Sequence, residues 1–433
     1  MDNDKIIIKG GNPLYGNVII GGMKNAALPI ICACVLNKET CIIDQIPPVS
    51  DIETMLLILS EMGAEVKRLA KNSVQINCRN IVPGSSPEYL VSKLRGSTYL
   101  LGAELGRFKK ASVSAPGGCS LGTRPTDLHQ KAFEAIGAKC SYKAGKLEII
   151  AEDGLHGNSI FFDKVSVGAT ANAILASVLA EGTTIIENSA REPHIVDLAV
   201  FLNACGANII GAGTSVIKVK GVDKLHGCRY SIVPDMIEAG TYMVAAAAAG
   251  GRVTVRNVIP KHLEAVSMKL EEAGAKVIIG DDSITVESNG KLKGISVTTA
   301  PYPGFPTDMQ PQMSAMLCFA EGASDINETV FDSRFQYADE LAKMGANIKS
   351  NGNHAIIRGG SVMTGAPLNC LDLRAGAAMV IAALATNGIS EIRGVDKINR
   401  GYYKICEKLA ALGADIELVQ ETYESKCAID AIM

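Results

Sequence analysis

The sequence has no excess of charge of either sign and no long hydrophobic run. Its 42 basic and 45 acidic residues give a net charge of −3, and the two signs are interspersed along the chain. Such a pattern offers no basic face for nucleic acid, so we expect no nucleic-acid partner. The richest apolar stretch, residues 242–250, is short and mostly alanine, so we also expect no membrane span.

The cysteines and histidines lack the spacing of metal ligands. Twelve cysteines are scattered without paired spacing, and the six histidines are dispersed. Cys32-x-Cys34 has no second ligand pair and lies in a helical pattern, which favours a core position over a zinc site. The acidic first residues are unlike a signal peptide. Together these features are typical of the reducing cytoplasm, where we expect the protein.

The chain contains no P-loop, no dinucleotide-binding glycine fingerprint and no nucleophile elbow. It does contain six copies of one short sequence signature. The repeated signature is a small or apolar residue, then Gly-Ala, then in most units a β-former. Its glycines stand at positions 63, 137, 206, 274, 345 and 413, at intervals of 74, 69, 68, 71 and 68 residues. Each glycine follows a helical pattern and precedes a strand pattern, so we interpret it as a helix C-cap.

A second signature keeps the same period. One small-residue helix without a polar face is predicted per unit, at residues 25–36, 96–106, 168–180, 238–249, 308–320 and 374–385. Helices of this kind are buried on all sides. The pattern predicts an α/β architecture in which a few units of about 70 residues close round buried helices. Six units divide into two groups of three, and we place the crossings near residues 21 and 233.

The residues in front of these buried helices are unusual. Four of the six starts carry a cation and three carry a carboxylate; they include Lys24, Arg95, Lys164, Asp235, Asp308, Asp372 and Arg374. Helix capping explains the aspartates. It does not explain the cations, which oppose the usual preference for acidic residues in a first turn. If symmetry brings the helix starts together, the cationic pocket would suit a substrate with several phosphates or carboxylates.

The stretch 114–125 holds three glycines and two prolines around Cys119. Glycine and proline at this density predict a loop. Arg124 would favour the thiolate, so a reactive Cys119 is one interpretation. An inert surface or half-buried thiol is the other, and the residues of this stretch leave both open.

Six motifs, in order along essentially the whole chain, resemble the UDP-N-acetylglucosamine 1-carboxyvinyltransferase family. They are Lys24-Asn25-Ala26-Ala27-Leu28-Pro29, residues 116–129 around Cys119, residues 164–170, residues 305–310, Asp372-Leu373-Arg374 and residues 396–402. The resemblance implies a two-domain inside-out α/β barrel with three repeats per domain. One domain would be residues 22–233, and the other would join residues 1–21 to residues 234–433.

The same resemblance implies transfer of the enolpyruvyl group of phosphoenolpyruvate to the 3-hydroxyl of UDP-N-acetylglucosamine, with release of phosphate and without a metal or cofactor. This is the committed step of peptidoglycan precursor synthesis. Lys24, Arg124 and Arg400 would hold phosphoenolpyruvate. Cys119 would donate a proton and form a covalent adduct, and Asp308 would be the base at the sugar hydroxyl. Further substrate-binding residues would be Asn25, Arg95, Pro125, Thr126, Asp127, Leu128, Lys164, Val165, Ser166, Val167, Val330, Arg334, Asp372 and Arg374.

Two other functions stay open. The sister family, the enolpyruvylshikimate-phosphate synthases, shares the barrel and the donor but uses a shikimate acceptor, and it resembles this chain only weakly around Cys119. A non-catalytic anion-binding paralogue is the second alternative. The argument against it is the joint presence of Lys24, Cys119, Asp308 and Arg400. Met23 and Met236 replace the usual Ala and Arg of the family, and Met236 bears on the contacts between the domains.

Overall fold

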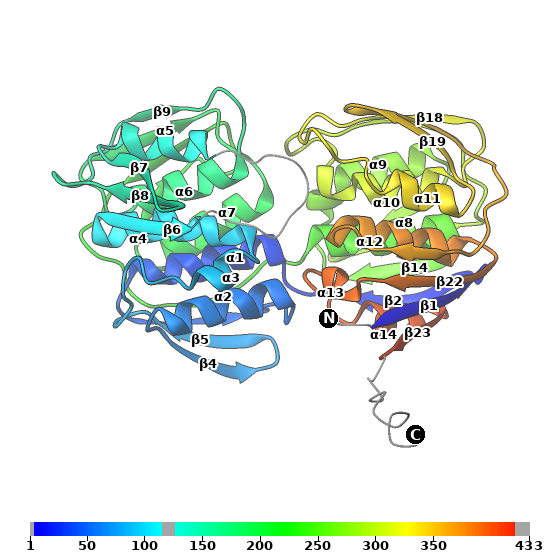
Figure 1. Ribbon diagram of the computed structural model, residues 1–433, viewed down its shortest axis with the longest axis horizontal. Coiled ribbons are helices and arrows are strands. Elements are labelled where there is room, and N and C mark those ends of the chain that lie inside the picture. Colours follow the sequence, from blue (N-terminus) through cyan, green and yellow to red (C-terminus); the bar gives the residue numbers. More distant parts are fainter. Residues whose placement is uncertain (1–3, 115–125, 421–433) are drawn as a thin grey trace, which may run out of the picture.

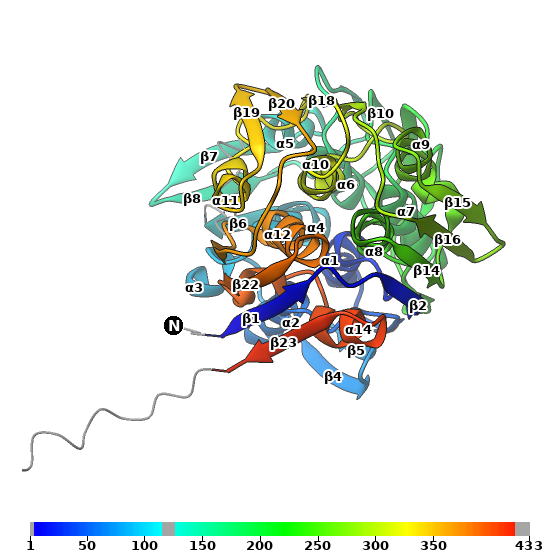
Figure 2. The same ribbon diagram turned by 90° about the vertical axis from the view of Figure 1, so that its right-hand side faces the viewer.

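The computed structural model describes residues 4–114 and 126–420, which form two lobes that lie side by side (Figure 1). Each lobe has helices inside and sheets outside. Figure 2 looks onto one lobe, where helices occupy the middle and strands surround them. These helices are α8 (Met236–Ala249), α10 (Gln310–Leu317) and α12 (Leu373–Ala385). The inside-out α/β barrel predicted from the sequence is thereby confirmed.

The six predicted capping glycines all have a left-handed backbone, with φ between 96° and 105°. A side chain would be strained there, which is why glycine recurs. The helices that end at these glycines are α2 (Ser50–Glu61), α5 (Asp127–Ala135), α7 (Pro193–Ala204), α9 (Glu264–Glu272), α11 (Ala338–Lys343) and α14 (Ile405–Ala411). The strands that follow are β4 (Glu65–Ala70), β7 (Lys139–Lys143), β11 (Asn208–Ile210), β15 (Lys276–Ile279), β19 (Asn347–Asn351) and β23 (Asp415–Val419). The sixfold repeat is therefore a property of the fold.

The predicted small-residue helices are the inner helices. In the first lobe they are α1 (Lys24–Ala33), α4 (Tyr99–Phe108) and α6 (Val167–Ser177), and α4 packs against both others. In the second lobe α8, α10 and α12 pack against one another. The structure buries 13 of the 14 residues of α8, so this helix has no polar face to show to solvent. Two inner helices begin with a 3₁₀ turn, η2 (Arg95–Thr98) before α4 and η4 (Thr307–Met309) before α10.

Five of the six sheets in the described residues share one arrangement. An antiparallel pair of strands meets a third antiparallel strand, and that third strand has a parallel neighbour at the edge. The additional strands are β1 (Lys5–Gly10), β2 (Leu14–Ile19), β3 (Thr40–Asp44), β5 (Ser73–Asn77), β9 (Ser159–Phe161), β10 (Thr183–Glu187), β12 (Val216–Lys220), β13 (Arg229–Ser231), β14 (Gly251–Arg256), β16 (Ser283–Ser288), β17 (Ser296–Thr298), β18 (Ala323–Asn327), β20 (His354–Arg358), β21 (Pro367–Asn369) and β22 (Gly388–Arg393). The sixth sheet has the order β6-β8-β7, with β6 (Lys110–Ser114) and β8 (Lys146–Ile150).

Three sheets are completed by strands from distant parts of the chain. β1 lies between β22 and β23 and is antiparallel to both, and β2 is the parallel neighbour of β14. In the other lobe β13 is the parallel neighbour of β3. The connecting segments run side by side, because Met23 N donates to Val233 O at 2.8 Å and Asp235 N donates to Gly21 O at 2.9 Å. These pairings support the division near residues 21 and 233, which stays a prediction.

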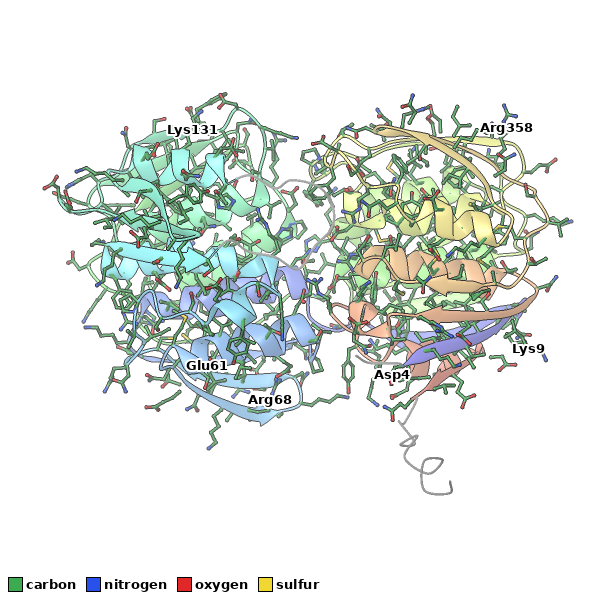
Figure 3. The ribbon with its side chains drawn as sticks, in the orientation of Figure 1. Asp4, Lys9, Glu61, Arg68, Lys131 and Arg358 are labelled. Carbon is green, nitrogen blue, oxygen red and sulfur yellow. The ribbon has the colours of Figure 1, made fainter. Side chains whose placement is uncertain are left out.

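In each lobe, charged side chains lie on the outside and apolar side chains lie in the core. Charged side chains such as Glu61, Arg68 and Lys131 are exposed on the outer faces (Figure 3). Cys32 and Cys34 belong to the core, as predicted, and are 0% and 2% exposed. Among the described helices, none has the length and hydropathy needed to cross a membrane.

Candidate functional site

A buried carboxylate joins two cations that come from different lobes. Asp51, in the first turn of α2, accepts from Lys24 Nζ at 3.0 Å and from Arg400 Nε at 2.8 Å. Lys24 begins α1, whereas Arg400 follows α13 (Val395–Ile398). The side chains of Lys24 and Asp51 are 10% and 7% exposed, and that of Arg400 is 25% exposed. Lys24, Asp51 and Arg400, here called the Asp51 cluster, therefore form a contact between the lobes. A ligand can reach this contact from the side of the partly exposed Arg400.

The charge of Asp51 is set by its two partners. Burial raises the pKa of the Asp51 carboxyl, but the charges of Lys24 and Arg400 outweigh burial and hold that pKa below its ordinary value. The ionised carboxylate compensates two cations that would otherwise repel each other. A phosphate or carboxylate ligand would compete with Asp51 for the same N–H donors.

A second carboxylate, Asp308, lies between two buried arginines. Its Oδ1 accepts from Arg334 Nη2 and its Oδ2 from Arg374 Nη2, both at 3.0 Å. The Arg334 and Arg374 side chains are 1% and 6% exposed, whereas Asp308 is 28% exposed. Arg374 is fixed by the start of α12, where Asp372 Oδ1 accepts from Arg374 N at 2.8 Å. In this Asp308 cluster the carboxylate is the outward-facing group.

The two clusters act on each other. Partial burial raises the pKa of Asp308, but the charges of Arg374 and Arg334 outweigh it, and Lys24 adds to their effect, so that pKa lies well below its ordinary value. Asp235 stands between the clusters. It caps α8, accepts from Lys24 N at 3.3 Å, and acts through its charge on Arg374. Cations of both lobes are thus gathered round three carboxylates.

The two arginines keep N–H groups without a partner. Within the residues that the structure describes, buried Arg334 Nε, Arg334 Nη1 and Arg374 Nε make no hydrogen bond. Arg374 Nη1 does donate to Tyr402 OH at 3.1 Å. Buried charged donors without a partner are costly, so they are typical of a site that an anion completes. The observation favours an anionic ligand at the Asp308 cluster.

Most of the predicted nucleotide-sugar residues of the first lobe lie at or just before the starts of η2, α5 and α6. Ser166 is the N-cap of α6, and its Oγ accepts from Ala169 N at 3.3 Å. Thr126 precedes α5, and its Oγ1 lies 2.7 Å from Tyr142 OH. Val167 is the first residue of α6 and is half-buried. Of the others, Lys164 and Asp127 are exposed, and Arg95, Leu128 and Val165 are half-buried. Asn25, in α1, and Val330, which follows β18 in the second lobe, are also half-buried.

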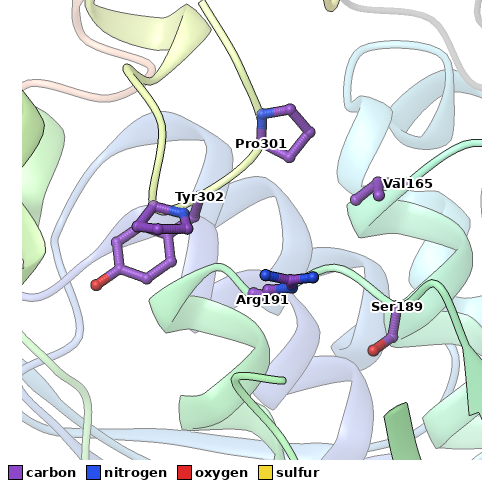
Figure 4. Close-up of a pocket in the computed structure, with 6 residues that line it drawn as sticks. Val165, Ser189, Arg191, Pro301 and Tyr302 are labelled. Carbon is purple, nitrogen blue, oxygen red and sulfur yellow. The ribbon is translucent and has the colours of Figure 1, made fainter. Parts of the chain in front are cut away.

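A pocket of about 200 Å³ lies between the lobes beside these helix starts. Figure 4 shows Val165, Ser189 and Arg191 on one side and the loop with Pro301 and Tyr302 on the other. Tyr302 N donates to Glu192 Oε1 at 3.2 Å, which ties the two sides together. Of the predicted site residues that the structure describes, only Val165 lines this pocket, and the Asp51 and Asp308 clusters lie outside its lining.

The side chain of His129 lies among the starts of η2, α5 and α6. Asn172 Nδ2 donates to its Nδ1 at 2.9 Å, and a Cβ built on Gly168 would lie 3.0 Å from its Cε1. Burial, and then the charge of Arg95, lower the pKa of His129 to about 4. The ring is therefore neutral at neutral pH and acts as a packed support for this part of the site.

This histidine predicts a loss of stability in mild acid. The unfolded chain binds a proton near pH 6.5 and the folded chain near pH 4, so the contribution of His129 falls as the pH drops below about 6.5. We expect the free energy of unfolding of the wild type relative to His129→Gln to fall by about 2 kcal/mol between pH 7.5 and 5. Urea unfolding at both pH values measures it. The exposed His226→Gln is the control, and a constant difference for His129→Gln would contradict the prediction.

Some predicted residues are not placed, and some placed residues were not predicted. Cys119, Arg124 and Pro125 lie outside the described residues. Asp51 was not singled out, because an acidic residue in the first turn of a helix is ordinary. Tyr402 was noted only as part of a motif. The importance of Asp51 follows from its contact with Arg400, 349 positions further along the chain, and that of Tyr402 from its contacts with Thr241 and Arg374. No local pattern reveals these contacts.

Comparisons with known proteins show the family of the chain. The family model of EPSP synthase (3-phosphoshikimate 1-carboxyvinyltransferase) matches residues 8–409. The UDP-N-acetylglucosamine 1-carboxyvinyltransferase 2 of Clostridium acetobutylicum is 54% identical over 414 residues, covering 95% of this chain and 99% of that protein. The UDP-N-acetylglucosamine 1-carboxyvinyltransferase of Clostridium botulinum is 53% identical over 413 residues, with coverage of 95% and 99%.

Solved structures show the same fold. The enolpyruvyl transferase NikO from Streptomyces tendae has a TM-score of 0.87 at 25% identity, over 98% of this chain and 100% of that chain. An EPSP synthase from Acinetobacter baumannii has a TM-score of 0.74 at 21% identity, over 96% and 100%. Fold and site together define an enzyme of the enolpyruvyl (carboxyvinyl) transferase class. Within that class, the chain belongs to the UDP-N-acetylglucosamine 1-carboxyvinyltransferase family.

Proposed function

We propose that this protein transfers the enolpyruvyl group of phosphoenolpyruvate to the 3-hydroxyl of UDP-N-acetylglucosamine and releases phosphate. The reaction would be the committed step of peptidoglycan precursor synthesis, in the cytoplasm. The names of relatives that are 53–54% identical over nearly the full chain support the acceptor. The observation that carries the proposal is the pair of clusters around Asp51 and Asp308. Between them they offer cations and unpartnered guanidinium donors to a polyanionic pair of substrates.

Phosphoenolpyruvate would bind at the Asp51 cluster. The donor carries a phosphate and a carboxylate, and Lys24 and Arg400 are the two cations already paired there. Arg124 would complete the set. Lys24 belongs to the proposed domain 22–233 and Arg400 to the proposed domain of residues 1–21 and 234–433. Donor binding would therefore hold the domains together in place of Asp51.

The sugar hydroxyl would meet Asp308. In the pairing described above, Asp308 is a weak base because Arg374 and Arg334 hold its pKa low. The diphosphate of the acceptor would engage the free N–H groups of the same arginines. This would weaken the attraction between the two arginines and Asp308. Its pKa would then rise toward the range in which it accepts the hydroxyl proton. Arg334 and Arg374 thereby link binding of the acceptor to activation of the base.

The chemical step needs a base, an acid and anion stabilisation. The sugar oxygen attacks C2 of phosphoenolpyruvate while its proton passes to Asp308, and the methylene C3 takes a proton from Cys119 to become a methyl group. The tetrahedral product keeps the negative charges of its phosphate and carboxylate, which Lys24 and Arg400 stabilise. Elimination returns one methyl proton to the enzyme, restores the double bond and breaks the bond from C2 to phosphate oxygen.

A phosphate-release assay with two acceptors tests the proposal. Phosphate is expected from phosphoenolpyruvate and UDP-N-acetylglucosamine together. It is not expected with shikimate 3-phosphate as acceptor, nor with phosphoenolpyruvate alone. Release with shikimate 3-phosphate only would assign the chain to the sister activity. Absence of release with both acceptors, from protein that is folded by circular dichroism, would indicate an anion-binding paralogue.

Cys119 is expected to be selectively alkylated by a small phosphonate epoxide that mimics phosphoenolpyruvate. The described thiols are buried or half-buried, and burial raises the pKa of Cys140 to about 12 and that of Cys406 to about 11, so these two are poor nucleophiles. Cys119→Asp should keep turnover, because a carboxylic acid also donates a proton, and should escape alkylation. Peptide mass spectrometry reads out the modified residue, and label on another cysteine would contradict the assignment.

A further inference from the structure

Three thiols from distant parts of the sequence meet in the first lobe. Cys41 lies in β3, Cys205 is the C-cap of α7, and Cys228 comes just before β13. Their Sγ atoms all lie within 4.8 Å of one another, and those of Cys205 and Cys228 are 3.3 Å apart. The C-terminal end of α7 is about 18 Å from its first residue, which follows Glu192 at the rim of the pocket. The thiols thus form a separate cluster.

Main-chain pairing holds the three cysteines in place. Ile42 N donates to Cys228 O at 2.9 Å where β13 meets β3, and His226 N donates to Cys205 O at 2.9 Å beyond the helix cap. Cys41 and Cys205 are 0% and 1% exposed, whereas Cys228 is half-buried. The cluster is therefore part of the rigid sheet-and-helix frame, with one side open to solvent.

The spacing suits a soft cation. Thiolates bound to one such ion at about 2.3 Å lie roughly 4 Å from each other, and the three Sγ atoms already stand at that scale. Asn37 Nδ2 donates to Cys41 Sγ at 3.4 Å, as groups that orient a metal ligand do. A fourth thiol, Cys34, interacts with Cys41 and also donates to Ile30 O at 3.5 Å. Three or four sulfur ligands select thiophilic d¹⁰ ions.

We propose that Cys41, Cys205 and Cys228 bind one soft d¹⁰ cation of the Zn(II), Cd(II) or Cu(I) class. As each sulfur–metal bond forms, the thiol proton leaves to solvent. No local pattern indicates this site, because Cys205 stands 164 positions after Cys41 and neither belongs to a local pair. The site lies apart from both carboxylate clusters and does not depend on the proposed reaction.

Cadmium titration of the reduced, full-length protein tests the proposal. We expect one equivalent of Cd²⁺ to produce sulfur-to-metal charge-transfer absorption and to raise the melting temperature by about 5 °C. Cys228→Ser and Cys205→Ser should lose both effects. Cys406→Ser, which removes another half-buried thiol, should keep them. Cys228→Ser is the main variant, because Cys228 is the least buried ligand and its change is least damaging to folding.

The outcomes separate cleanly. Absorption and stabilisation that persist in both Cys228→Ser and Cys205→Ser would overturn the proposal, as would absence of uptake by the reduced wild type. A Cys205–Cys228 disulfide found by mass spectrometry would overturn it too if the protein takes up no Cd²⁺ after reduction. Loss of uptake in Cys228→Ser counts as support only when that variant keeps the melting temperature of the metal-free wild type.

Discussion

Replacing Asp308 with asparagine is expected to lower turnover by about 10²–10⁴, the usual loss when a general base is removed. The amide keeps the shape of the side chain but accepts no proton from the sugar hydroxyl. It still accepts hydrogen bonds through one oxygen, so the affinity for UDP-N-acetylglucosamine should change far less than kcat. Steady-state kinetics with both substrates, together with calorimetric binding of the acceptor, measure the two effects separately.

The structure also predicts a stability cost for this variant. From the sequence alone, Asp308→Asn should leave the melting temperature almost unchanged. The structure pairs the carboxylate with buried Arg334 and Arg374, so loss of its charge leaves two guanidinium groups uncompensated. Because Asp308 itself is partly exposed, we expect a loss of about 1–3 kcal/mol. The exposed Asp332→Asn, in the segment that also carries Arg334, is the control. Normal turnover of Asp308→Asn would reduce Asp308 to a structural partner of the arginines.

The repeat and its inner helices were predictable because their signals are local. Each of the six units has a glycine with positive φ after the helix that precedes its Gly-Ala signature, and each has an inner helix that is largely buried. Capping by Asp235 and Asp372 was predictable for the same reason, since an N-cap interacts with residues two and three positions on. Local rules therefore account for the elements and for the residues at their starts.

The pairing of those elements needed the structure. No local pattern places β1 between β22 and β23, because β1 is separated from both of them by nearly the whole chain. The same holds for Asp51 with Arg400 and for the three thiols around Cys205. The cation Lys24 was recognised as unusual, but its partner Asp51 was not, since Asp51 is an acidic residue in the first turn of a helix. The residue types that carry the chemistry could be read from the sequence, but which distant segments lie close together in space could not.

Replacing Lys24 with methionine is expected to lower kcat/KM for phosphoenolpyruvate by about 10²–10³, the loss typical of one charge-stabilising group. Methionine keeps the length and apolar stem of lysine, so packing at the start of α1 is retained. The exposed Lys38→Met is the matched control, and kinetics with varied phosphoenolpyruvate at saturating acceptor measure the effect.

A double variant separates substrate binding from support of Asp51. Lys24→Met leaves Asp51 with Arg400 as its one hydrogen-bonded cation among the described residues, and that imbalance by itself would disturb the cluster. Lys24→Met combined with Asp51→Asn removes one charge of each sign and restores the balance. If Lys24 binds the donor, the double variant stays as inactive as Lys24→Met, because the cation that faces the phosphate or carboxylate is still missing. Recovery of wild-type kcat/KM in the double variant would mean that Lys24 only compensates Asp51, and that Arg400 and Arg124 hold the donor without it.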